Sequence, residues 1–167
     1  MNQDRLRKLA ERLEREAAAD EELLKKAREV EAARRGASAE LFAVCHAFVG
    51  AVNSLLTTLR LELSPETFPP EAFRDTGVNL IQINARGRLI QIVFESTPAL
   101  SSTELFRTPY VLQGSVRWFN QDFIDTTGIE EEQVFYCIGQ GWRFQNVRTR
   151  RSGPFDHEHL IQLMEQL

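Results

Sequence analysis

Histidines, cysteines and grouped carboxylates are the residues of this chain that could do chemistry. His157 and His159 stand two residues apart, and side chains at that spacing on a helix point in nearly opposite directions. We therefore expect no metal ion shared between them. Cys45 and His46 fall in a predicted core helix, where we interpret them as a buried thiol beside a histidine at the rim of the core. The sequence predicts no metal and no cofactor.

Carboxylates gather between residues 120 and 133, in the stretch NQDFIDTTGIEEEQ. A calcium-binding EF-hand loop does not fit, because Ile124 occupies a ligand position and no glycine stands sixth. Asp122 and Asp125 could share one helical turn for acid–base work, but no histidine or lysine is near them in sequence. We interpret the stretch as a capped turn with an acidic exit and predict no catalytic residue.

The segment YCIGQGWRFQNVRTRR, residues 136 to 151, combines aromatic rings with arginines. Exposed rings beside Arg148, Arg150 and Arg151 could bind single-stranded nucleic acid by stacking and phosphate contacts. However, Trp142 and Phe144 lie on the same face of a predicted strand, which is the usual placement of core aromatics. The net charge of −4 also argues against polyanion binding. We expect a solvated basic corner, and weak nucleic-acid binding is only the third hypothesis.

A charged helix is predicted for residues 1 to 36. Of the first 35 residues 19 are charged, and none is Gly, Pro, Ser or Thr, so a continuous helix is expected. Arg34, Arg35 and Gly36 predict its end. A narrow apolar stripe predicts self-association as a coiled coil, and a solvated helix lying on its own domain is the alternative. The stripe consists of Leu6, Leu9, Leu13, Leu24 and Val30.

An α+β domain is predicted for residues 37 to 167. Ser38 is expected to cap a core helix over 38–61, which a proline-rich connector, 64–73, follows. The next part, 77–149, alternates apolar and polar residues and predicts an antiparallel meander of about five strands, packed on one face by helices. Residues 152 to 154 (Ser-Gly-Pro) should end the last strand, before a helix over 155–167. The strands are expected at 77–85, 88–95, 110–119, 133–138 and 142–149.

The second face of this sheet should be polar, with Gln91, Gln113 and Arg117 on it. The order of helices and strands resembles that of small acidic secretion chaperones, which implies protein binding. We therefore expect a non-catalytic interaction, scaffold or chaperone-like module that binds itself and another protein. The alternative is a small-molecule sensor or an enzyme that uses the polar face and the hydroxyl-rich loop 95–108.

Two features concern the compartment. No secretion signal is evident at the start, and no run of about 18 apolar residues is apparent, so we expect no membrane span. The two cysteines, Cys45 and Cys137, lack CxxC spacing. This pattern favours a reduced, cytoplasmic protein.

Overall fold

The computed structural model describes residues 2–167. Contacts within the chain divide it into two compact units, Met1–Ala32 and Ala33–Leu167. One helix, α1 (Gln3–Leu55), contributes to both units. The division falls close to the boundary predicted at residue 36.

The helix does not end at Gly36, as the sequence had suggested, and α1 continues to Leu55. A glycine inside a helix costs only about 1 kcal/mol relative to alanine. Residues that follow it, such as Leu41, Cys45 and Phe48, are almost completely buried in the core of the sheet domain. Burial of this apolar face outweighs the cost of the glycine, so the prediction of two separate helices is wrong.

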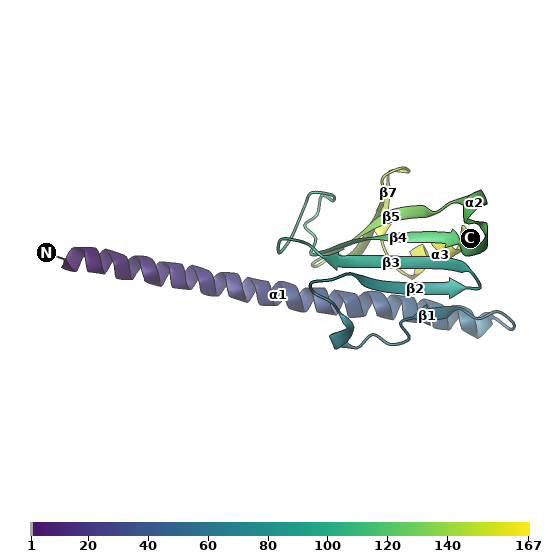
Figure 1. Ribbon diagram of the computed structural model, residues 1–167, viewed down its shortest axis with the longest axis horizontal. Helices are drawn as coiled ribbons and strands as arrows, with labels where there is room; N and C mark the ends of the chain where they lie inside the picture. Colours follow the sequence, from purple (N-terminus) through teal and green to yellow (C-terminus); the bar gives the residue numbers. More distant parts are fainter. Residues whose placement is uncertain (1) are drawn as a thin grey trace. The chain divides into compact units, whose positions relative to one another are not determined.

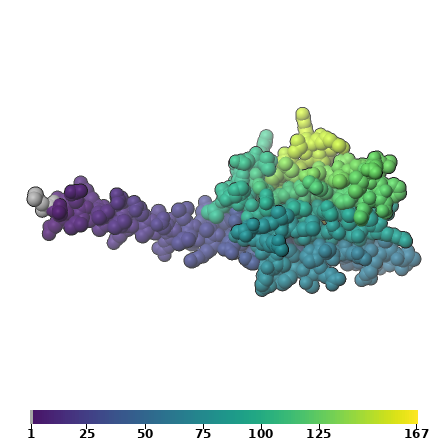
Figure 2. All heavy atoms as spheres, viewed as in Figure 1, coloured from purple at the N-terminus to yellow at the C-terminus, as the bar shows by residue number. Residues whose placement is uncertain are grey.

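The first unit is a single helical rod (purple in Figure 2). Alanine, leucine and long charged residues fill it, and these residue types lose little side-chain freedom in a helix. Arg12 and Glu16 form an ion pair one turn apart, at 3.5 Å. Such a pair adds only a few tenths of a kcal/mol, so helix propensity is the main stabilising factor here.

The second unit contains an antiparallel sheet of seven strands in sequential order (Figure 1). The predicted α+β class and the meander are confirmed, but two short edge strands, β1 and β7, were not expected. Residues 152 to 154 were predicted to end a strand and instead belong to β7. The strands are β1 (Glu62–Ser64), β2 (Asn79–Ala85), β3 (Arg88–Ser96), β4 (Leu112–Asn120), β5 (Glu130–Cys137), β6 (Gly141–Asn146) and β7 (Arg151–Pro154).

Short elements and tight turns connect the strands. The turn between β2 and β3 has positive φ at Arg86 (54°) and Gly87 (92°), and both Gly139 and Gly141 have positive φ around the β5–β6 turn. These tight turns join the strands that the sequence predicted at 77–85 and 88–95 and at 133–138 and 142–149. The remaining elements are the 3-10 turns η1 (Pro70–Ala72) and η2 (Gln121–Phe123) and the helices α2 (Ile124–Thr127) and α3 (His157–Glu165).

The core lies on the inner face of the sheet, which α3 and the part of α1 after Ala33 cover (Figure 1). Alternate residues of each strand point into it, and the register aligns Ile81, Ile92 and Val116 across β2, β3 and β4. Trp142 and Phe144 are 5% and 6% exposed, which confirms them as core residues. The indole nitrogen of Trp142 donates a hydrogen bond to the carbonyl oxygen of Ala37, at 2.8 Å.

Candidate functional site

The outer face of the sheet carries the polar residues that the sequence assigned to it. Gln91 donates to Gln82 at 2.8 Å, and Arg117 donates to Glu131 at 3.2 Å. The strand register places these four residues in one row across β2, β3, β4 and β5. Two of the three predicted face residues are therefore used in side-chain pairs within the sheet.

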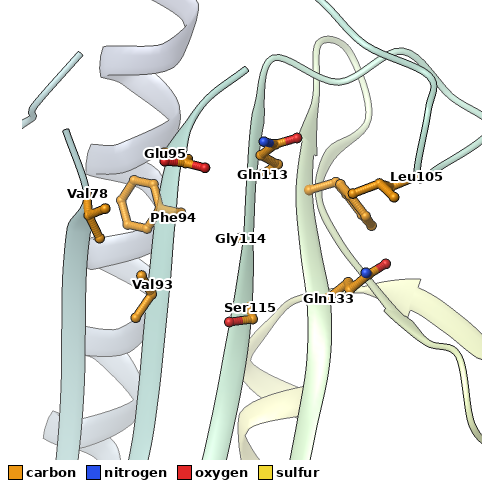
Figure 3. A pocket seen from close by; sticks show the side chains of 10 residues that line it. Val78, Val93, Phe94, Glu95, Leu105, Gln113, Gly114, Ser115 and Gln133 are labelled. Atoms are coloured by element: carbon orange, nitrogen blue, oxygen red, sulfur yellow. The ribbon is translucent and has the colours of Figure 1, made fainter. Parts of the chain in front are cut away.

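A hollow of about 290 Å³ lies on this face next to that row, beginning two residues further along strands β3 and β4. Val78 and Val93 line one side, and Leu105 lines the other (Figure 3). Gln113 is the third predicted face residue, and it is the only one of the three that lines the hollow. The complete lining is Val78, Val93, Phe94, Glu95, Leu105, Gln113, Gly114, Ser115, Gln133 and Phe135.

The polar side chains of the hollow have no partner among the described residues 2–167. Glu95 and Gln113 lie at one end, and Ser115 and Gln133 at the other (Figure 3). No histidine, lysine or cysteine of the described chain lines the hollow, and its one carboxylate, Glu95, lies at the opposite end from Ser115 (Figure 3). The arrangement offers apolar surface and unpaired hydrogen-bonding groups, which suits binding.

Part of the predicted functional loop packs on the outer face and forms a wall of the hollow. The ring of Phe106 stacks on Phe135 with centroids 5.0 Å apart, and the Tyr110 ring lies 4.6 Å from Phe135. The hydroxyl of Tyr110 accepts a hydrogen bond from the backbone nitrogen of Leu105, at 3.1 Å. Together with buried Cys137 these rings form a small second core. The loop is thus ordered by packing.

Arg34 fixes the two ends of this loop, a role that the sequence did not suggest. Its guanidinium donates to the carbonyl oxygens of Val111, Thr97 and Ala99 at 3.0, 3.3 and 3.0 Å, and to the Thr97 hydroxyl at 3.0 Å. The Asp75 carboxylate lies 3.6 Å away. Arg34 was predicted to lie in the last turn of a helix, but the residue is only 7% exposed.

A second polar site is buried in the core between β5 and α3. The Nε2 atom of His159 lies 2.7 Å from a carboxylate oxygen of Glu132, and Asn146 donates to the other oxygen at 3.1 Å. The His159 ring stacks on Phe144 with centroids 3.7 Å apart. Its Nδ1 atom has no hydrogen-bond partner. Neither residue lines the hollow on the outer face, and Glu132 and His159 are only 8% and 5% exposed, so a structural role fits the pair best.

Sequence reasoning missed this pair, although both positions carried a signal. Glu132 precedes Val134 by two residues, so strand alternation places both on the inner face. His159 precedes Leu163 by four residues, which places both on one helix face. His157, by contrast, is exposed, and its ring contacts Phe48. The run of three glutamates had been interpreted as the acidic exit of a capped turn.

The basic corner is exposed on the strand-connecting segment after β6. Arg148 lies 3.5 Å from Glu130, and Arg150 has a φ of 58°. Arg151 begins β7 and is exposed. Since Trp142 is buried in the core, its ring is not accessible for stacking with a base.

The other residues considered for chemistry lie apart from the hollow. Cys45 is buried, and burial raises the pKa of its thiol to about 12. His46 is exposed, as are Asp122 and Asp125 around α2. Within residues 2–167 no group of three or more His, Cys, Asp and Glu side chains could hold a metal ion.

The leucines of the first unit are exposed to solvent. Leu6, Leu9 and Leu13 are 60%, 42% and 52% exposed, and Leu24 is 58% exposed. Val30, the last residue of the predicted stripe, is 5% exposed and does not belong to this surface. Leu23, which the sequence analysis did not include, is also 61% exposed.

One helix of the described chain, α1, is long and apolar enough over 18 residues to cross a membrane by length and composition alone. The charged residues before Gly36 place that window in the later part of the helix. Core helices pass the same test, and Leu41 and Phe48 of this part are buried against the sheet. Only 28% of this 18-residue segment is buried, because small residues such as Ala43 and Ala47 lie on its solvent side.

Comparisons with protein-family models, with curated proteins and with solved structures each find no match to this chain.

Proposed function

We propose that this chain is a non-catalytic, cytoplasmic protein-interaction module, scaffold- or chaperone-like, that self-associates through the N-terminal part of α1. The observation that carries the proposal is the row of Leu6, Leu9 and Leu13, which is exposed on a helix in which 19 of the first 35 residues are charged. A leucine side chain gains about 1.5–3 kcal/mol when it is fully buried. Three neighbouring exposed leucines therefore favour association.

The sheet domain supports a binding role in a different way. Its edge strands, β1 and β7, are only three and four residues long, so they offer little backbone for strand pairing with a partner. Part of the exposed apolar surface lies on the outer face, where Val78, Leu80 and Leu105 are 54%, 48% and 52% exposed around the hollow. A protein partner would meet apolar walls and unpaired amide groups there.

Light scattering of matched variants tests the proposal. Changing Leu6, Leu9 and Leu13 together to alanine keeps a strong helix former at each position and removes the apolar row. We expect this variant to be monomeric and equally helical by circular dichroism. The control, Ala18→Gln with Ala19→Gln, also preserves helix propensity and should assemble like the wild type. If the alanine variant keeps the mass of the wild-type assembly, self-association through this segment is refuted.

A further inference from the structure

The hollow beside Leu105 is apolar in its walls and acidic at its rim. Val78 and Leu105 are 54% and 52% exposed, and Leu80, which pairs with Val93 in the register, is 48% exposed. Glu95 is the only charged residue in the lining. Its carboxylate has no partner among the described residues. An occupant that matches this surface is apolar and carries positive charge beside its apolar groups.

The first turns of α1 have this chemistry. Leu6, Leu9 and Leu13 follow one another at spacings of three and four, so they share one face of the helix. Residues 4–12 hold four basic and two acidic side chains. Residues 14–22, in contrast, hold five acidic side chains, one basic side chain and no leucine. Leucines and positive charge also occur together at residues 23–28, but Leu6, Leu9 and Leu13 are the three that form a row along one helix face.

Pairing of two such helices with each other is less complementary. The spacing that relates the leucines continues to Glu16 and Asp20. In a parallel pair in register, each acidic residue would face its own copy across the seam. An antiparallel pair that sets residues 5–12 against residues 14–22 matches the charges, but it brings Leu6 opposite Asp20. Either arrangement places carboxylates in the apolar seam.

We propose that the leucine row of one copy docks in the hollow of a second copy. Leu6 and Leu9 contact the side chains of Val78 and Leu105, and the flanking basic residues lie near Glu95. This inference rests on the self-association proposed above and names the surface that receives the helix. Two such contacts related by a two-fold axis close a dimer.

Cross-linking between full-length copies tests the contact. One copy carries Leu9→Cys and the other carries Val78→Cys, and a short bismaleimide is added to the mixture. The two native cysteines are buried, and burial raises the pKa of each thiol, so they should not react. The control replaces the second copy with Ile138→Cys, a position that is 56% exposed and does not line the hollow.

The proposal predicts a cross-linked dimer from the Leu9→Cys and Val78→Cys mixture and little from the Ile138→Cys control. A dimer that forms only between two Leu9→Cys chains would mean helix-to-helix pairing; it overturns this inference and leaves self-association intact. If no mixture gives a product and the protein is a monomer, both proposals are wrong. If the protein assembles but the Leu9→Cys and Val78→Cys mixture gives no cross-link, only this inference is wrong.

Charge reversal provides an independent check of the geometry. Adding Glu95→Lys to the Val78→Cys copy should lower the yield of the cross-link by up to about fivefold, the range expected for a surface ion pair. Adding Lys8→Glu to the Leu9→Cys copy should then restore it. Loss of yield without restoration would contradict the predicted proximity of these two residues.

Discussion

Replacing Arg34 with methionine should destabilise the sheet domain, because this side chain joins α1 to both ends of the loop beside the hollow. Methionine keeps the apolar stem of the side chain and removes the guanidinium. The change therefore isolates the hydrogen bonds from the packing. Any loss of stability should therefore come from the missing charge-assisted hydrogen bonds of the guanidinium.

The magnitude follows from the acceptors that remain. The carbonyl oxygen of Val111 still accepts from the Thr97 amide at 3.1 Å, and that of Ala99 still accepts from the Thr97 hydroxyl at 2.6 Å. Only the Thr97 carbonyl oxygen loses its partner. Hydrogen bonds to a charged group contribute about 1.5–3 kcal/mol each, but burying that charge also has a cost. We expect a net loss of about 2–3 kcal/mol in the free energy of unfolding.

Urea unfolding measures this loss, and hydrogen exchange locates it. The amides of Thr97, Ser102 and Tyr110 bond within the loop, and they should exchange faster in the variant. Amides in the centre of β3 should exchange at rates set by global stability alone. Arg28→Met is the control, since this arginine of the same helix is exposed. If Arg34→Met unfolds within about 0.5 kcal/mol of the wild type, with loop exchange unchanged, the anchoring role is refuted.

Two further predictions concern buried groups. Glu132→Ala leaves the donors of His159 and Asn146 without their acceptor and should lower the free energy of unfolding in urea by about 3–5 kcal/mol. The control, Glu131→Ala, breaks an exposed ion pair on the other face of the same strand and should cost at most about 1 kcal/mol. Equal losses in the two variants would contradict the burial of Glu132. The folded-state pKa of the Cys45 thiol, about 12, lies above its ordinary value of 9.0, so the unfolded chain loses the proton first as pH rises. The contribution of the protonated Cys45 thiol to the free energy of unfolding should be fully present below pH 9 and decrease above it. Between pH 8 and pH 10 the free energy of unfolding should therefore fall by about 1 kcal/mol more in the wild type than in Cys45→Ala. Parallel curves of this free energy against pH for the two proteins would refute the prediction.

The architecture of the sheet could be predicted because each strand has one buried face. Alternation along β3 places Ile90, Ile92 and Phe94 inward, and the register in the structure agrees. Trp142 and Phe144 followed the same rule, which is why an apparent stacking platform was correctly assigned to the core. Period-two patterns are reliable when a face is buried, because a shift by one residue would expose every apolar side chain.

The course of α1 could not be predicted from local signals. Arg34, Arg35 and Gly36 together are typical of a helix end, yet the helix continues because Leu41 and Phe48 bury its next turns against the sheet. Packing against the sheet decides whether the helix ends or continues, and a short stretch of sequence does not show this packing. For the same reason a deletion of residues 1 to 35 would remove Arg34 from the loop that it anchors.

The candidate binding surface was only partly visible in the sequence. Gln91, Gln113 and Arg117 were correctly placed on the outer face, but only Gln113 borders the hollow. The hollow exists because loop residues near Leu105 pack beside the strands, through ring contacts with Phe135. Contacts between a loop and a distant strand depend on the three-dimensional fold, and strand periodicity does not report them.

The molar mass of the full-length protein in solution tests the central claim most directly. One chain has a mass of 19.2 kDa. Sedimentation velocity across a dilution series should give a mass above this value that falls on dilution, as expected for association through a small apolar row. A mass of one chain at every concentration, up to the highest that remains soluble, would contradict self-association through α1.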